Sequence, residues 1–216
     1  MMGALLDPLN DGISSLELID QMGGDLSVVN AARVSYGKRS EVVTEKDQKL
    51  ISYLMRNQHG TPFEHVTFQF RVRAPLFVVH QWERHRVASY NEESGRYIEL
   101  REDFYTPSGD RLDLGEYSED SLSHMREHWE RSWDLYQMFI ARGMARELAR
   151  IVLPVSLYKE FWWTVNARSL MNFIELRADD HAQWEIRRYA EVLEEIFAEV
   201  TPNLQKAFFL NGRKAP

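Results

Sequence analysis

The alternation of apolar and polar residues over 66–73 (VTFQFRVR) constrains the fold more than any other feature of the sequence. Valine and phenylalanine alternate there with threonine, glutamine and arginine, so the two kinds of side chain would point to opposite faces of an extended chain. This period of two predicts a strand with one buried face. Pro75 then suits the first residue of a helix that continues towards Arg84.

Helical spacing of apolar residues marks much of the remaining chain. Asp25 is the expected cap of the first helix and Gly37 the residue that ends it, while Thr44 and Asp47 resemble a capping box. A second strand is expected over 158–165, where aromatic residues are frequent. The expected helices cover about 26–36, 45–57, 119–141, 144–152 and 181–199, with a short one from 168.

The segments between these elements predict the domain organisation. A polar loop is expected up to about residue 96, and the turn formers over 106–118 predict a surface connection. There is no internal repeat or convincing linker, and neither GxGxxG nor GxxxxGK[ST] is present. The sequence therefore predicts one α+β domain over 1–216, with a mainly antiparallel sheet flanked by helices and no Rossmann fold.

The composition narrows the classes of function. The chain has 216 residues, 44% of them hydrophobic and 27% charged, which is typical of a globular protein with a sizeable core. A net charge of −7 argues against broad contact with nucleic acids or anionic membranes. No stretch approaches the ~20 consecutive apolar residues of a membrane span, and the first residues do not resemble a secretory signal, so a cytoplasmic location is expected. The absence of cysteine excludes an enzyme thiolate nucleophile.

Polar residues that suit a nucleotide are concentrated over 81–96 (QWERHRVASYNEESGR). Arginine forks match phosphate oxygens, serine hydroxyls and a glycine N–H can complete an anion cradle, and Asn or Gln can bind the edge of a base. The alternative is a solvated surface loop in which Glu83, Glu92 and Glu93 pair with the arginines.

Within this segment, Arg84-His85-Arg86 is followed after seven residues by Ser94, which resembles the signature of flavin-dependent thymidylate synthases. The resemblance continues through most of the chain, including AARVSYG, HGTPFEH, RELARIVLP and WTVNARSLMNFIELRADDHAQWEI. It implies methylation of dUMP to dTMP, with 5,10-methylenetetrahydrofolate as carbon donor and FAD reduced by NADPH as hydride source. It also implies a homotetramer whose active sites are built from several subunits.

The resemblance also implies roles for individual residues. Arg84, His85 and Arg86 would contact FAD, with Arg84 also near the nucleotide, and His59 matches a histidine near the reacting rings. The other flavin positions are Ser35, Thr61, Glu64, Glu92, Asn166, Arg168, Asn172 and His181. The dUMP positions are Gln81, Arg84, Glu92, Ser94, Gly95, Arg96, Arg150 and Arg177.

Plainer interpretations exist for several of these residues. Thr61 could belong only to a turn and Glu64 only to a strand end, while Asn166 and Asn172 could simply cap or end a short helix. The aromatic run 158–163 could stack on a flavin, although aromatic residues at such spacing more often form a core.

No metal site is expected. His124 and His128 have the spacing of two metal ligands, but the intervening Glu of HExxH is missing, and a polar helix face explains the pair.

Uracil C5 is a poor nucleophile, and this chain has no cysteine to activate it by addition at C6. A cation beside the pyrimidine edge would instead favour the N3-ionised ring, and Arg177 is the candidate for that role. The alternative is a helix-end arginine paired with Glu175 or Asp179. Ser94 has no neighbouring base in the sequence and is assigned to dUMP binding.

Two other classes of protein remain open at this point. The arginine-rich loop could belong to a nucleotide-binding regulatory module that performs no reaction. It could also belong to an RNA-binding protein that uses Arg84, Arg86, Arg96 and nearby aromatic residues, although the negative net charge disfavours this second alternative.

Overall fold

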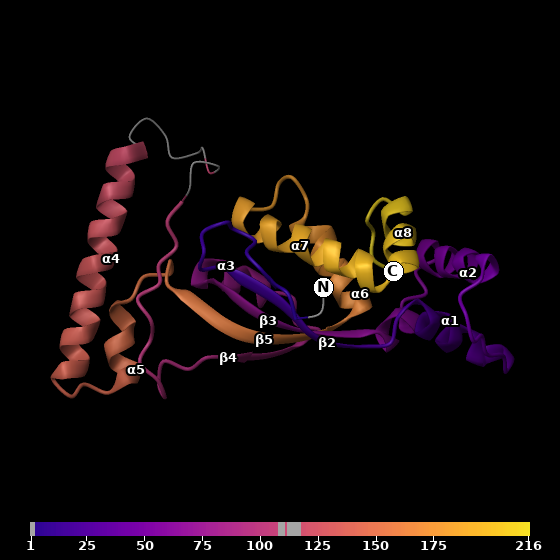
Figure 1. Ribbon diagram of the computed structural model, residues 1–216, viewed down its shortest axis with the longest axis horizontal. Coiled ribbons are helices and arrows are strands. Elements are labelled where there is room, and N and C mark those ends of the chain that lie inside the picture. Colours follow the sequence, from indigo (N-terminus) through magenta and orange to yellow (C-terminus); the bar gives the residue numbers. More distant parts are fainter. Residues whose placement is uncertain (1–2, 108–110, 112–117) are drawn as a thin grey trace.

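A five-stranded antiparallel sheet forms the centre of the described chain (Figure 1). The structure is a computed structural model that describes residues 3–107, 111 and 118–216. The strands lie in the order β1 (Leu5–Leu6), β2 (Ser15–Met22), β3 (Thr67–Pro75), β5 (Tyr158–Asn166) and β4 (Ser89–Glu92). The predicted α+β class with an antiparallel sheet is confirmed, while the domain boundary at 1–216 stays a prediction.

The two strands predicted from the sequence, β3 and β5, are neighbours in the sheet. Their register places Phe70 opposite Trp163, and the two rings lie 5.6 Å apart. Both side chains are fully buried, as are the other apolar residues that share this face of β3. Burial of each large side chain stabilises the fold by about 1.5–3 kcal/mol. The aromatic run of β5 is therefore mainly core, although Trp162 points to the opposite face and is exposed.

The strands β2 and β4 were not predicted. The sequence of β4, SYNE, was expected to lie in a polar loop, and that expectation is wrong. β4 is an edge strand that forms only because β5 supplies its hydrogen-bonding partner, with Tyr90 opposite Trp163. Such pairing depends on tertiary context rather than on local propensity.

The helices α3 (Leu76–Trp82), α6 (Ala167–Arg177) and α7 (Trp184–Val200) pack over the sheet (Figure 1). Pro75 precedes α3 as its N-cap rather than as its first residue. Trp82, at the end of α3, is buried against the rings of Phe173 and Trp163 at centroid distances of 4.7 and 5.2 Å. This packing fixes the position of the residues that follow α3.

A second group of helices gathers at one end of the sheet: α1 (Asp25–Arg33), η1 (Val34–Tyr36), α2 (Glu45–Arg56), η2 (Thr61–His65) and α8 (Pro202–Leu210). The Thr44 and Asp47 capping box is confirmed. Gly37 ends η1 with a left-handed φ of 63°, as expected.

Asp25 does not cap α1, whose N-cap is Gly24, so that prediction is wrong. Its carboxylate instead accepts hydrogen bonds from the backbone N–H groups of Asn203 and Leu204, both at 3.0 Å. Asp25 therefore stabilises the start of α8, a helix that the sequence analysis missed because it ended the last helix before Pro202.

At the other end of the sheet, α4 (Ser118–Ala141) extends away from the main body, beside α5 (Arg146–Ala149) and η3 (Arg150–Val152) (Figure 1). These elements enclose a small apolar cluster around Tyr136 and Leu157. The long helix was predicted, and the helix expected over 144–152 is divided into α5 and η3. Most of the connection predicted over 106–118 lies outside the described residues. No described helix combines the length and apolarity needed to cross a membrane.

Candidate functional site

A cleft of about 570 Å³ lies among η2, the segment after α3, α6 and the C-terminal segment. We call it the arginine cleft. Its lining includes Glu64, Arg84, His85, Arg86, Arg168, Asn172 and Arg177. The structure therefore brings together residues that lie far apart in the sequence and that were predicted to contact the flavin or the uracil ring.

The segment 84–86 is held at the cleft by its neighbours on both sides. Trp82 anchors the preceding helix in the aromatic core. The hydroxyl of Tyr90, on β4, donates a hydrogen bond of 2.8 Å to the backbone carbonyl of His85. The unpredicted strand β4 therefore helps to position the arginine-rich segment.

Arg177 lies at the end of α6 and contacts this segment directly. Its Nε donates to Nε2 of His85 at 3.1 Å, and its Nη2 donates to the backbone carbonyl of Gln81 at 3.0 Å. Burial, together with the positive charge of Arg84, lowers the pKa of Arg177. In the described chain Arg177 forms no ion pair with Glu175 or Asp179, so the alternative of a simple helix-end pair is not observed.

His85 is neutral in this arrangement. Burial and the Arg177 cation lower its pKa from 6.5 to about 4, and a hydrogen bond with Asn172 opposes them only in part. Because Nε2 accepts the Arg177 N–H, the imidazole proton must reside on Nδ1. A neutral ring can thus orient the guanidinium group without cancelling its charge.

Arg84 and Arg86 have no carboxylate partner among the residues that the structure describes. Two of the three glutamates that were considered as their partners are engaged elsewhere: Glu92 contacts Lys159 and Glu93 contacts Arg101. The third, Glu83, forms no ion pair with Arg84 or Arg86 among the described residues. The interpretation of a loop whose charges neutralise one another is therefore wrong for these two arginines. Uncompensated guanidinium groups beside a third arginine favour an anionic ligand.

Arg168 is held differently, although it lines the same cleft. It forms an ion pair with Glu64 at 2.7 Å, and its Nε donates to the backbone carbonyl of Pro216 at 2.7 Å. Gly60 packs so closely that a Cβ atom there would lie 2.4 Å from Nε of Arg168. A side chain at residue 60 would therefore displace this guanidinium group.

Other predicted site residues line neighbouring clefts. Ser35, His59 and Thr61 line a second cleft of about 610 Å³ between η1, α2 and η2. His181 lines a third cleft, which Arg177 also borders. Asn166 caps α6, because its side chain accepts a hydrogen bond from the backbone N–H of Ser169 at 2.9 Å. Its observed contact is therefore the helix cap that was considered as the alternative to flavin binding.

Several residues predicted to bind dUMP lie towards α5 rather than in the arginine cleft. Arg96 forms an ion pair with Glu147 at 3.2 Å. A Cβ atom on Gly95 would lie 3.1 Å from Cδ of Arg150, so these two residues pack closely. In Figure 1, α5 and α6 lie towards opposite ends of the sheet. One chain therefore does not gather all its predicted nucleotide contacts around one cleft.

Several residues near these sites were missed. Ala215 and Pro216 line the arginine cleft, and no local signal marks them because only the fold brings the tail to α6. Gln183 accepts a hydrogen bond from the Gln81 side chain and donates another to the buried carboxylate of Glu185. Lys159 had a visible signal, a cation within an aromatic strand.

The two-histidine motif lies on α4, and its surroundings can be compared with those of a metal site. No group of three or more His, Asp or Glu residues is placed to hold a metal ion in the described part of the chain. His124 is exposed on α4 and contacts Asp120 and Glu127.

The fold and the cleft together define an α+β protein with a concentrated cationic site outside a Rossmann fold. The family model described as "Thymidylate synthase complementing protein" matches residues 17–203. The chain belongs to this family.

Similar proteins extend the comparison. The flavin-dependent thymidylate synthase of Thermotoga neapolitana is 50% identical over 197 residues, covering 89% of each chain. That of Thermosipho africanus is 49% identical over 205 residues, covering 89% of this chain and 90% of the relative. A crystal structure of the UMP/dUMP methylase PolB from Streptomyces cacaoi bound with 5-Br dUMP superposes with a TM-score of 0.88 at 38% identity, covering 94% of this chain and 97% of that one.

Proposed function

We propose that this chain is a flavin-dependent thymidylate synthase that converts dUMP into dTMP, with 5,10-methylenetetrahydrofolate as carbon donor and NADPH as reductant. The observation that carries the proposal is the arginine cleft, in which Arg84 and Arg86 lack carboxylate partners among the described residues and lie beside Arg177. The names of the relatives and of the superposed methylase support the same reaction.

The residues of the arginine cleft fit FAD. The cofactor carries an anionic pyrophosphate, and Arg84, Arg86 and Arg168 offer guanidinium donors to it. The neutral imidazole of His85 and the side chain of Asn172 add uncharged polar contacts. When bound, FAD would supply the hydride that completes the methyl group.

Arg177 would act on the uracil ring. Its guanidinium group is oriented by His85 and by the carbonyl of Gln81, and in the described structure its Nη1 makes no hydrogen bond. A cation held in this way would stabilise the negative charge of the N3-ionised ring and make C5 more nucleophilic. This role needs no cysteine, in agreement with the sequence.

We also propose that the active site is shared between chains of a homotetramer. Ser94, Gly95, Arg96 and Arg150 lie towards α5, and none of them lines the arginine cleft. A second copy could bring its α5 region to the cleft of the first. This arrangement would unite the predicted phosphate contacts with Arg177.

The primary test is formation of dTMP from dUMP, methylenetetrahydrofolate and NADPH by the purified protein with added FAD. We expect flavin absorbance that titrates with the protein, and product that depends on each component. A folded sample that binds dUMP and FAD without forming dTMP would instead support a regulatory module. A sample that binds neither would contradict the proposal entirely.

Mixed assemblies test the sharing of sites. Arg177→Ala and Arg150→Ala chains, each expected to be weakly active alone, should recover activity after they are dissociated and reassembled together. Recovery requires that Arg177 of one chain and Arg150 of another serve the same site. Light scattering should give a tetramer, and an active monomer of about the 25.4 kDa chain mass would contradict this part.

A further inference from the structure

Lys159 occupies an unusual place for a cation. It lies on β5 in the row that also contains Phe161 and Trp163, which face the core, and only 5% of its surface is exposed. A buried charge destabilises a fold unless hydrogen bonds and opposite charges surround it. The partners of Lys159 therefore indicate what the residue is for.

Its two partners are the last residue of β4 and the residue that follows it. Nζ of Lys159 donates to the backbone carbonyl of Glu93 at 2.8 Å and lies 3.1 Å from Oε1 of Glu92. The backbone N–H of Glu93 donates to the carbonyl of Glu160 at 2.9 Å, which extends the pairing of β4 with β5 by one residue. The segment is thus held by main-chain and side-chain contacts at the point where the strand ends.

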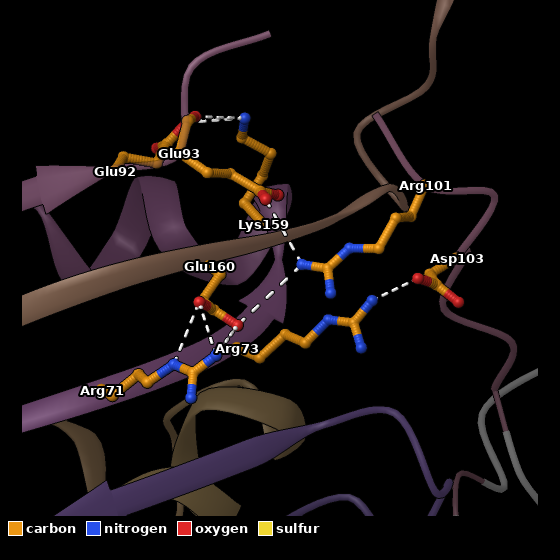
Figure 2. Close-up of polar contacts among 8 residues, drawn as sticks. All are labelled: Arg71, Arg73, Glu92, Glu93, Arg101, Asp103, Lys159 and Glu160. Carbon is orange, nitrogen blue, oxygen red and sulfur yellow. Dashed lines mark hydrogen bonds and ion pairs between the residues drawn. The ribbon is translucent and has the colours of Figure 1, made fainter. Parts of the chain in front are cut away.

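A second set of contacts holds the same segment from the other face of β5. Successive strand residues point to opposite faces, so Glu160 lies on the face away from Lys159. The carboxylate of Glu93 contacts Arg101 at 3.3 Å, and Arg101 lies 3.9 Å from Glu160 (Figure 2). Arg71 completes this exposed group through its contact with Glu160 at 3.0 Å (Figure 2).

The buried contact matters more than the exposed ones. The side chains of Arg71 and Arg101 are 46% and 52% exposed, so water competes for their ion pairs. Lys159 is shielded, and its loss would leave the carboxylate of Glu92 and the carbonyl of Glu93 without this partner. Ser94 follows directly in the chain.

We propose that Lys159 is a positioning residue that fixes the 92–96 segment in its nucleotide-binding geometry by holding the carboxylate of Glu92 and the carbonyl of Glu93. This inference rests on the proposed function, because it assumes that the segment binds dUMP. Lys159 itself does not touch the substrate. It acts through the chain that it anchors.

The test is Lys159→Met, which keeps an unbranched side chain only one atom shorter but removes its charge and its donors. We expect the dissociation constant and KM for dUMP to rise by about tenfold to a hundredfold, since small misplacements of binding groups have effects of that order. The value of kcat at saturating dUMP should stay near that of the wild type. Lys159→Arg, which restores a cation, should recover part of the affinity.

Arg71→Gln is the matched control, because it removes an exposed cation of the same network that does not contact Glu92 or Glu93. It should leave dUMP affinity unchanged. A folded Lys159→Met variant with normal dUMP affinity would overturn the inference, even if its melting temperature fell. If that variant fails to fold, Lys159→Gln keeps an uncharged donor group and allows the same comparison. A wild-type protein that does not bind dUMP would instead overturn the proposed function.

Discussion

Two regions of this chain use the same kinds of cation in opposite ways. On β3 and in the segment after β4, the arginines have carboxylate partners: Arg71 with Glu160, Arg73 with Asp103, and Arg101 with Glu93 (Figure 2). In the arginine cleft, Arg84 and Arg86 have no such partner in the described chain, and Arg177 is held by a neutral histidine and a carbonyl. Arg168 is the exception in this cleft, because it pairs with Glu64.

The difference separates structural cations from those available to a ligand. A paired arginine already has its charge neutralised, and an incoming phosphate must displace a carboxylate. An uncompensated one gains more from binding an anion than it loses. Arginine content alone does not distinguish the two regions. The two regions are distinguished by the partners of their arginines. Substitutions should therefore have different consequences in the two regions.

Arg177→Ala should have the largest effect. If Arg177 stabilises the ionised uracil ring, single-turnover dTMP formation by the FAD-loaded, dUMP-saturated enzyme should fall by about a hundredfold or more, as it does when an oxyanion donor is lost. FAD affinity and melting temperature should change little. Arg177→Lys should recover only part of the rate, because lysine lacks the planar fork. A near-normal rate in the alanine variant would remove Arg177 from the mechanism.

Substitutions at the flavin positions should have the next largest effect. Arg84→Ala should weaken FAD binding by about 1.5–3 kcal/mol, the range for a hydrogen bond to a charged group. The loss of FAD binding energy for Arg168→Ala should lie towards the lower end of this range. Arg168 must first exchange its contacts with Glu64 and Pro216 for contacts with the ligand. Spectroscopic titration measures both. Equal affinity for wild type and both variants would show that the residues were assigned wrongly.

A pH-dependent difference should follow from His85. Its pKa is about 4 in the fold and 6.5 ordinarily, so between these values the unfolded chain binds a proton that the folded chain does not. The stability from the neutral ring is present above pH 6.5 and is lost as the pH falls towards 4. His85→Gln can still accept the Arg177 N–H without titrating, so the melting temperature of the FAD-free variant should fall less steeply over this range. Parallel curves would contradict the shift.

Arg71→Gln should have the smallest effect. The Arg71–Glu160 pair is exposed, and such pairs contribute about 0–1 kcal/mol to the free energy of unfolding. Activity and FAD affinity should be unchanged, and chemical denaturation should detect at most a small loss of stability. A large loss of activity would show that the paired arginines also contribute to ligand binding, so the two regions would not differ in function.

The local parts of the fold could be predicted because their causes are local. The alternation over 66–73 predicted β3, and the capping box of Thr44 and Asp47 predicted the start of α2. β4 could not be predicted, since its four polar or aromatic residues become a strand only against β5. Asp25 was given the right function but the wrong helix, because its partners, Asn203 and Leu204, are about 180 positions away in the sequence.

The sequence by itself determined the family signature, the absence of a thiolate nucleophile and the set of polar residues available for chemistry. Tertiary structure alone decided which of those residues are free and which are paired. Arg177 meets His85 across 92 positions, and Lys159 meets Glu93 across 66. Periodicity and capping depend on neighbours within a few residues, so they can be read from the chain. The partner of a charged side chain depends on which distant segments pack against one another. That arrangement is set by the packing of the whole core.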